Sequence, residues 1–230
     1  LEFRRVLFRS DDLPAMDNDL WRRGQPSVHA KFGESSAILV GDALLTGAFQ
    51  VVSEANALAA NVQKVSDEQV ITIIRQLSRY AGANGMVIGQ IHDMQNHGHQ
   101  KSDVTYDWLL NDVYAPKTAA LISYAADIGG KLSQEMASTL VHPKTQYDLY
   151  QFGYDFGLAF QIQDDIDDFD QDNDEAVDSL PHLVGMAAAK RTRNDLLADA
   201  RQRLTNIAQR EASFDRQLLD EFLDLIGESV

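Results

Sequence analysis

The sequence has no cysteine, a shortage of basic residues and no long apolar run. Without cysteine the chain forms neither disulfides nor thiolate metal sites, which suits a reducing compartment. With 20 Lys and Arg against 35 Asp and Glu, its formal net charge of −15 argues against binding nucleic acid or anionic membrane surfaces. No uninterrupted apolar run is long enough to cross a bilayer. We therefore expect a cytoplasmic protein without stable membrane insertion.

Helical periodicity dominates the sequence, and we find no convincing alternating strand. With 230 residues, 44% of them hydrophobic, the chain can bury a sizeable core. We predict a bend at Pro116, a helix end at Gly129-Gly130 and an acidic loop over residues 171–184. No repeat or Ser/Gly linker divides the chain, so we predict one all-α domain over residues 11–230. The helices expected are 28–52, 67–94, 104–128, 144–168, 186–208 and 214–226.

The first ten residues differ from the rest of the chain. They are basic and apolar in an otherwise acidic sequence, and residues 5–10 match the translation of a common sequencing adapter. The apolar part is too short for a signal peptide, and no small-residue cleavage site follows it. We therefore expect residues 1–10 to be non-native, with the native sequence starting near Asp11 and its upstream part missing.

Two aspartate-rich clusters are the most informative feature of the sequence. Carboxylates this close repel one another by about 1 kcal/mol per pair even in water, so each cluster favours a bound cation. Hard oxygen ligands favour Mg2+ or Ca2+, and Mg2+ commonly shares its coordination shell with substrate phosphates. Arg22-Arg23, just after the first cluster, suits such phosphates. The candidate metal ligands are Asp11, Asp12 and Asp17 in the first cluster and Asp164, Asp165 and Asp168 in the second.

Each cluster could be a metal site or only a solvated polar segment, and the spacing of its carboxylates helps to decide between the two. In the second cluster, the i, i+4 spacing puts the first and last carboxylates on one helix face, after an aromatic stretch with two glycines. This favours a metal site. The first cluster is spaced too widely for an ideal helix, so a bulge at residues 14–15 would have to bring Asp17 back to Asp11. A polar turn is the alternative there.

Two further groups of residues are less specific. Lys117 and Thr118 offer an ammonium and a hydroxyl to phosphate oxygens, although such a pair alone is more often a surface feature. The six histidines show no ligand-like spacing. Helical spacing also relates a set of small and polar residues, which is more typical of tight helix packing than of a site: Gly85, Met86, Gly89, Gln90 and Asp93.

Together these residues resemble the trans-type isoprenyl diphosphate synthases, specifically the bacterial farnesyl and geranylgeranyl diphosphate synthases. Order and intervals fit from Asp11 to about Val230, so the resemblance is specific. The matching stretches are Asp11-Asp12-Leu-Pro-Ala-Met-Asp17-Asn-Asp19, Arg22-Arg23-Gly24, Phe32-Gly33-Glu34, Gly41-Asp42-Ala43-Leu44, Gly85-Met86, Gly89-Gln90 with Asp93, Lys117-Thr118, and residues 160–168.

The resemblance implies the isoprenoid synthase fold, an all-α helical bundle around a central cavity, in a homodimer. It also implies a Mg2+-dependent prenyltransferase of isoprenoid biosynthesis, which condenses isopentenyl diphosphate with an allylic diphosphate. Farnesyl diphosphate is the favoured product, and geranylgeranyl diphosphate comes next. Metal and basic residues stabilise the departing diphosphate.

The family's roles can be carried over to this sequence residue by residue. The main metal ligands are Asp11, Asp17 and Asp164, which with Lys117 form the catalytic set. Asp12, Asp165 and Asp168 support them. The allylic diphosphate is held by Arg22, Lys117, Thr118 and Gln161, and isopentenyl diphosphate by Arg23.

The sequence also departs from the family pattern. The upstream Gly-Lys and Arg that bind isopentenyl diphosphate have no counterpart, and lysines after the second motif are missing, with Val177 in the place of one. Tyr114 replaces a usual His, and Ala119 a usual Gly. We therefore expect little or no activity from this form of the chain. The alternatives are a non-catalytic subunit of a heteromeric synthase, a Ca2+-binding helical protein, and a terpene synthase-like protein of the same fold.

Overall fold

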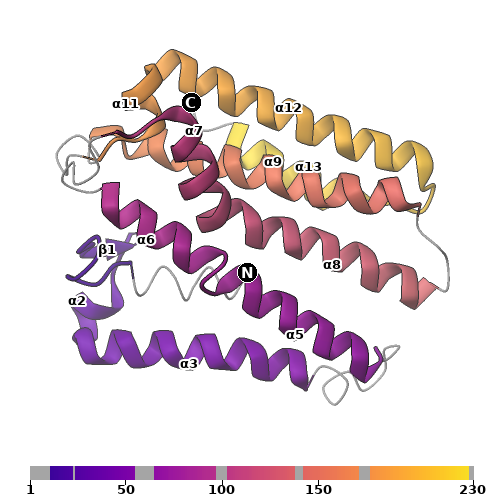
Figure 1. The fold of residues 1–230 in the computed structure, drawn as a ribbon, viewed down its shortest axis with the longest axis horizontal. Coiled ribbons are helices and arrows are strands. Elements are labelled where there is room, and N and C mark those ends of the chain that lie inside the picture. The colour runs from indigo at the N-terminus through magenta and orange to yellow at the C-terminus, as the bar shows by residue number, and fades with distance from the viewer. Residues whose placement is uncertain are drawn as a thin grey trace. The chain divides into compact units, whose positions relative to one another are not determined.

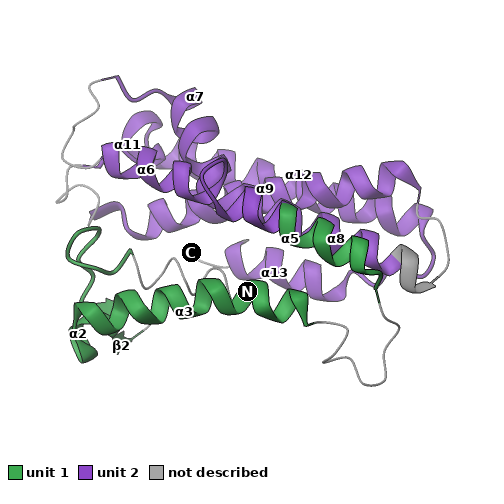
Figure 2. Cartoon of the chain, turned by 60° about the horizontal axis from the view of Figure 1, so that its bottom comes forward, with its two compact units in different colours: residues 1–75 green, residues 76–230 purple. Residues whose placement is uncertain are grey.

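The computed structural model describes residues 11–22, 24–54, 65–96, 103–137, 142–170 and 177–227. It divides the chain into two compact units, residues 1–75 and 76–230 (Figure 2). The proposed non-native segment 1–10 lies outside the described residues. The single domain over residues 11–230 stays a prediction, because compact units are not by themselves separate domains.

Unit 1 begins with the acidic turn and a short antiparallel hairpin, which the sequence did not predict. Its elements are β1 (Trp21–Arg22), β2 (Gln25–Pro26), α2 (Val28–Phe32), α3 (Glu34–Ser53) and the start of α5 (Asp67–Ala81) (Figure 1). The single helix predicted over residues 28–52 is wrong. The helix is interrupted at Gly33, whose φ of +87° lies in the left-handed region that glycine tolerates.

The start of α5 confirms the predicted capping box. The backbone N–H of Ser66 donates to Gln69 Oε1 at 2.5 Å, and the Gln69 N–H donates to Ser66 Oγ at 3.2 Å. A continuous helix to residue 94 is wrong, because α5 ends at Ala81 and α6 (Met86–Asn96) follows a turn. Only glycine fits at Gly85 in that turn, since a Cβ there would collide with the backbone of residue 80.

In unit 2 the predicted 104–128 helix is longer and less regular than expected. It runs through α7 (Tyr106–Trp108), the π-helix η2 (Leu109–Ala119) and α8 (Ala120–Ala137). The predicted end at Gly129-Gly130 is wrong, because α8 packs against α9 and continues past the glycines. Around Pro116, where a bend is predicted, the helix is a π-helix, whose wider turns accommodate a residue without an N–H donor.

Helix α9 is the central helix of unit 2 and packs against α12, α8 and η2 (Figure 1). Helix α9 spans Pro143–Asp167 and α12 spans Met186–Arg210, with α11 (Leu180–Val184) and α13 (Gln217–Gly227) beside them. The acidic loop predicted over 171–184 is wrong where α11 forms, and residues 171–176 lie outside the described residues. The expected core positions are confirmed, because α9 packs Leu149, Phe152, Phe156 and Phe160 against α12 and α13.

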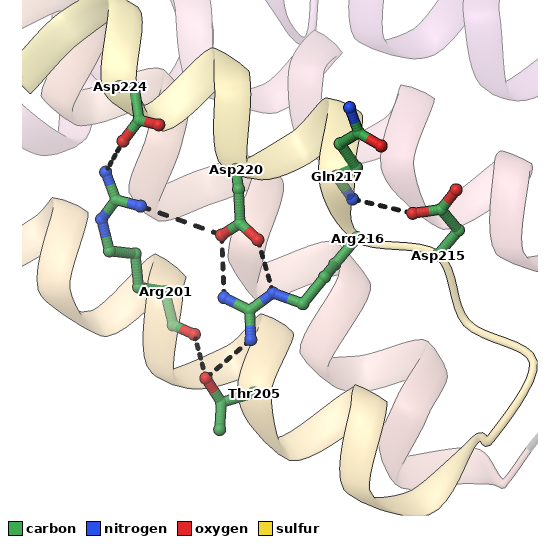
Figure 3. A network of polar contacts seen from close by, with 7 residues as sticks. All are labelled: Arg201, Thr205, Asp215, Arg216, Gln217, Asp220 and Asp224. Carbon is green, nitrogen blue, oxygen red and sulfur yellow. Dashed lines mark hydrogen bonds and ion pairs between the residues drawn. The ribbon is translucent and has the colours of Figure 1, made fainter.

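Arginines of α12 tie the helices of unit 2 together. Arg210 donates to Asp148 of α9, and Arg203 Nε donates to Asp155 Oδ2 at 2.5 Å. A more exposed network joins α12 to α13, in which Arg216 forms a bidentate pair with Asp220 (Figure 3). The buried pairs fix how α9 lies on α12, and α9 carries the second aspartate cluster.

Candidate functional site

The first aspartate cluster folds as a turn. The Asn18 N–H donates to the Leu13 carbonyl at 3.1 Å, and the Asp17 N–H donates to the Asp11 carbonyl at 2.8 Å. Asn18 has a φ of 55°, in the left-handed region where Asn is enriched. The turn brings Asp17 back to Asp11 as predicted, but residues 11–17 form the polar turn given as the alternative and not a bulged helix.

Arg22 of β1 is held by the carboxylates of this cluster. Its Nε and Nη2 donate to Asp12 Oδ1 at 2.9 and 2.6 Å, and Nη2 also donates to Asp19 Oδ2 at 3.0 Å. Burial raises the pKa of Asp12 above its ordinary 3.8, and the Arg22 hydrogen bond opposes the rise. The guanidinium predicted to hold the allylic diphosphate is thus already paired with a predicted metal ligand. Arg23 lies outside the described residues.

The second cluster lies at the C-terminal end of α9. Asp168 ends the helix, and its N–H donates to the Asp164 carbonyl at 2.9 Å, which keeps these two residues one turn apart on the same side, as predicted. Asp165 differs from both, because it is only 7% exposed, whereas Asp164 is half-buried and Asp168 is exposed. The three carboxylates therefore have unequal access to a solvated metal ion.

Asp165 accepts hydrogen bonds from three elements. The Tyr114 hydroxyl of η2 donates to Asp165 Oδ2, the Leu180 N–H of α11 donates to the same oxygen at 3.1 Å, and Gln161 Nε2 donates to Oδ1 at 3.4 Å. Burial and the adjacent carboxylate raise the pKa of Tyr114 well above 10.0. The hydroxyl thus stays protonated and donates. In this structure Asp165 joins η2, α9 and α11.

The π-helix directs two predicted diphosphate ligands to different neighbours. Thr118 donates through Oγ1 to Gln161 Oε1 of α9 at 2.7 Å. Lys117 forms an ion pair with Asp93 of α6, and both side chains are largely buried. Thr118, Gln161 and Asp165 thus form one hydrogen-bonded series, whereas Lys117 belongs to the α6 side.

Two glycines allow these helices to approach closely. A Cβ on Gly89 of α6 would collide with the backbone of Lys117, and a Cβ on Gly157 of α9 would lie 2.5 Å from Ala119 Cα. Substitution at either position would push η2 away from its neighbour. This confirms the tight packing predicted at Gly89 and the close approach predicted on the face of α9.

The clusters offer only carboxylate oxygens, a donor set that suits Mg2+. Across the described parts of the chain, no three His, Cys, Asp or Glu side chains are grouped closely enough to hold a metal ion. Mg2+ usually keeps waters and binds through one or two carboxylates together with substrate phosphates. The residues thus fit a shared metal–diphosphate site, and within each unit they do not form an all-protein cage.

Some residues with a part in the site were not assigned to it from the sequence. Tyr114 was noted only as a departure from the family, and its acceptor lies 51 positions away. Asp93 was assigned to helix packing, yet it pairs with Lys117. Gln90 is 6% exposed, and its amide atoms have no hydrogen-bond partner among the described residues. The signals for the last two are their helical spacing from Gly89 and their place among the stretches that resemble the family.

A mainly helical chain with two carboxylate clusters, the first of them paired with Arg22, indicates the class of metal-dependent enzymes acting on diphosphates. A family model described as polyprenyl synthetase matches residues 6–179. Farnesyl diphosphate synthase of Escherichia coli (strain K12) is 36% identical over 228 residues, covering 94% of this chain and 71% of the relative. Geranylgeranyl pyrophosphate synthase 7, chloroplastic, of Arabidopsis thaliana is 34% identical over 209 residues, covering 84% of this chain and 55% of the relative.

Solved structures agree with these relatives. Geranyltransferase from Helicobacter pylori 26695 matches with a TM-score of 0.80 at 28% identity, covering 99% of this chain and 72% of that one. A second structure of that species' geranyltransferase, complexed with magnesium and isoprenyl diphosphate, matches with a TM-score of 0.77 at 28% identity, covering 99% and 71%. The chain belongs to the polyprenyl synthetase family. The predicted family and all-α fold are confirmed, and the predicted prenyltransferase function is confirmed at the level of the family.

Proposed function

We propose that the chain is a Mg2+-dependent prenyltransferase that condenses isopentenyl diphosphate with an allylic diphosphate, with farnesyl diphosphate as the favoured product. One observation carries the proposal: hydrogen bonds lead from Thr118 through Gln161 to Asp165. They join two predicted diphosphate ligands to the second aspartate cluster within one unit. Family membership supports the same chemistry.

The metal ligands we propose are Asp11, Asp17 and Asp164, supported by Asp12, Asp165 and Asp168. Bound Mg2+ would supply positive charge to the departing diphosphate. The protein's own cations would donate to the diphosphate oxygens, Arg22 through its guanidinium and Lys117 through its ammonium. Carboxylates already hold both cations, so little side-chain freedom is lost when substrate binds.

The amide of Gln161 can orient substrate because both of its ends are held. Its oxygen accepts from Thr118, and its nitrogen donates to Asp165. A Gln161→Leu substitution would break the series while leaving the aspartates in place. We expect it to raise KM for the allylic substrate about tenfold or more, because one or two oriented hydrogen bonds are lost.

Calorimetry with an unreactive allylic ligand tests substrate binding. The ligand is geranyl diphosphate with sulfur in place of the bridging oxygen, titrated with Mg2+ or with EDTA. We expect binding only with Mg2+, and at least about tenfold weaker binding in Asp164→Asn, since a metal ligand is weakened. Asp195→Asn, which alters an exposed carboxylate on α12, is the matched control. Binding without Mg2+, or the same affinity in both variants, would contradict the proposal.

A condensation assay tests the chemistry and the product. Labelled isopentenyl diphosphate and geranyl diphosphate are incubated with this chain, and with the reading frame that contains it, at saturating Mg2+. Chromatography of the products then gives their chain length. Formation of a C15 diphosphate supports the proposal, and its absence from both proteins opposes it. Activity only after a second synthase is added would favour the heteromeric subunit.

We also propose that the protein is a homodimer in which α3 contributes to the interface. Four apolar side chains of this helix, Ile38, Leu39, Leu45 and Val51, are 37–67% exposed. The helix is also long and apolar enough, by length and composition, to cross a membrane, although Asp42 interrupts its apolar run. So many exposed apolar side chains are more than most solvated helices carry. Light scattering should give a dimer, which Leu39→Asp weakens and Gln50→Asp, an exposed polar control, does not. A monomeric wild-type protein would refute this.

A further inference from the structure

Helix α12 carries a buried arginine with no part in the proposed mechanism. Arg193 is only 7% exposed. Its Nη1 donates to Gln163 Oε1 of α9, while Nε and Nη2 donate to Asn194 Oδ1 at 3.1 and 2.8 Å. These acceptors are all amide oxygens. Within the part of the chain that the structure describes, no carboxylate forms an ion pair with this guanidinium.

The other α12 arginines that reach α9 behave differently. Arg203 meets the carboxylate of Asp155, and Arg210 that of Asp148. Burying a charge is unfavourable unless it is paired and hydrogen-bonded, so Arg193 needs an explanation that its amide acceptors do not give. The explanation lies one hydrogen bond further along α9.

Gln163 connects Arg193 to the second aspartate cluster. Its Oε1 accepts from Arg193, and its Nε2 donates to Asp167 Oδ1 at 2.7 Å. The two partners fix the orientation of this amide, which is 5% exposed. Hydrogen bonds in series polarise one another, so the amide passes part of the effect of the guanidinium to Asp167. Asp167 lies within the acidic stretch 164–168 and is not among the proposed metal ligands.

We propose that Arg193 is a positioning residue and the built-in counter-charge of the second aspartate cluster. Through Gln163 it holds Asp167 and offsets part of the repulsion among the carboxylates of residues 164–168. Its positive charge also opposes binding of a free metal ion, so the cluster takes Mg2+ mainly together with diphosphate. The last step rests on the proposed function, whereas the connection to Asp167 does not.

A double-mutant cycle without metal tests the connection. Urea unfolding in EDTA is measured for wild type, Arg193→Met, Asp167→Asn and the double variant. Each single substitution lowers the folding equilibrium constant, but Asp167→Asn is less harmful when Arg193 is absent. We expect the two substitutions to be coupled by a factor of about two to ten in the folding equilibrium constant, since Asp167 is exposed and the contact runs through an amide. Arg191→Met, which removes an exposed arginine of α12, should show none. Additive effects of Arg193→Met and Asp167→Asn would overturn the proposal.

Measuring the affinity for Mg2+ separates an electrostatic role of Arg193 from a purely structural one, because loss of a purely structural arginine would not tighten Mg2+ binding. Mg2+ alone is titrated into wild type, Arg193→Met and Arg191→Met by calorimetry. We expect Arg193→Met to bind Mg2+ about two- to fivefold more tightly, because a desolvated positive charge near the cluster is lost. Solvent and salt screen Arg191, so its variant should match wild type. Unchanged or weaker binding in Arg193→Met would overturn the counter-charge. If wild type binds no Mg2+ even with the unreactive diphosphate ligand present, the proposed function fails, and the cycle still decides the connection.

Discussion

Replacing Tyr114 by phenylalanine removes one hydroxyl from the interior of unit 2. That hydroxyl donates to Asp165, and it also lies 3.0 Å from the Leu180 N–H, which donates to it. Tyr114 is 2% exposed, and phenylalanine fills the same ring volume, so no large cavity forms. The substitution therefore isolates the hydrogen bond that joins η2 to the second aspartate cluster and α11.

The loss can be estimated from the partners that remain. A hydrogen bond to a charged group contributes about 1.5–3 kcal/mol. In the variant, Asp165 still accepts from Leu180 at 3.1 Å and from Gln161 at 3.4 Å, so the carboxylate is not left unpaired. We therefore expect Tyr114→Phe to lower the free energy of unfolding by about 2 kcal/mol at pH 7.

The pH dependence provides a second check with a defined sign. The pKa of Tyr114 is raised well above 10.0, so the folded protein keeps a proton that the unfolded chain releases near pH 10. The stability that this group contributes is present below pH 10 and is lost as the pH rises, by up to about 1.4 kcal/mol per pH unit. The difference in the free energy of unfolding between wild type and Tyr114→Phe should therefore become smaller above pH 10.

Urea unfolding at several pH values measures both effects. Tyr106→Phe is the matched control, because it removes a tyrosine hydroxyl that is exposed. The reasoning fails if Tyr114→Phe costs less than about 0.5 kcal/mol at pH 7, the range of ordinary surface substitutions. It fails equally if the difference in the free energy of unfolding between wild type and Tyr114→Phe stays constant up to pH 11.

Four further substitutions can be measured by the same unfolding assay. Gly157→Ala should cost about 2 kcal/mol, because its Cβ would lie 2.5 Å from a backbone atom of η2. A Cβ at Gly129 would meet no atom within 4 Å, so Gly129→Ala should stabilise the protein by up to about 1 kcal/mol. Equal effects of Gly157→Ala and Gly129→Ala on stability would contradict the close packing at Gly157. Asp148→Ala should cost about 3 kcal/mol, because arginines of α12 lose a buried carboxylate; a loss under 1 kcal/mol would count against this estimate. Arg216→Met should cost at most about 1 kcal/mol at pH 7, because the side chains of its bidentate pair (Figure 3) are partly exposed, at 31% and 28%. Arg216 lowers the pKa of Asp220, so this difference should disappear as the pH falls below 3.8, and a constant difference would contradict it.

Local signals in the sequence were sufficient for much of the fold. The capping box at Ser66 and Gln69 marks a helix start because its hydrogen bonds join residues three apart. The return of Asp17 to Asp11 follows from local geometry at residues 14–15 in the same way. Such features depend on neighbouring residues, so a single sequence contains the information needed.

Features that depend on tertiary packing could not be predicted in this way. Gly129-Gly130 looks like a helix end, but α8 continues because packing against α9 outweighs the weak helix propensity of glycine. The π-helix around Pro116 places Thr118 against α9 and Lys117 against α6, and no local pattern specifies that division. The connection of Tyr114 to Asp165 spans 51 positions, so it appears only in the folded chain.

The repulsion that made the two clusters conspicuous in the sequence is partly offset within the protein. Arg22 pairs with Asp12, the Tyr114 hydroxyl donates to Asp165, and Arg193 acts through Gln163 on the acidic stretch at the end of α9. Each donor stabilises charge that a metal would otherwise have to neutralise. A cluster already compensated in this way gains less from Mg2+ alone, whereas a diphosphate adds negative charge that the protein has not compensated. The arrangement should therefore make metal and diphosphate binding cooperative, with each raising the affinity for the other by the same factor.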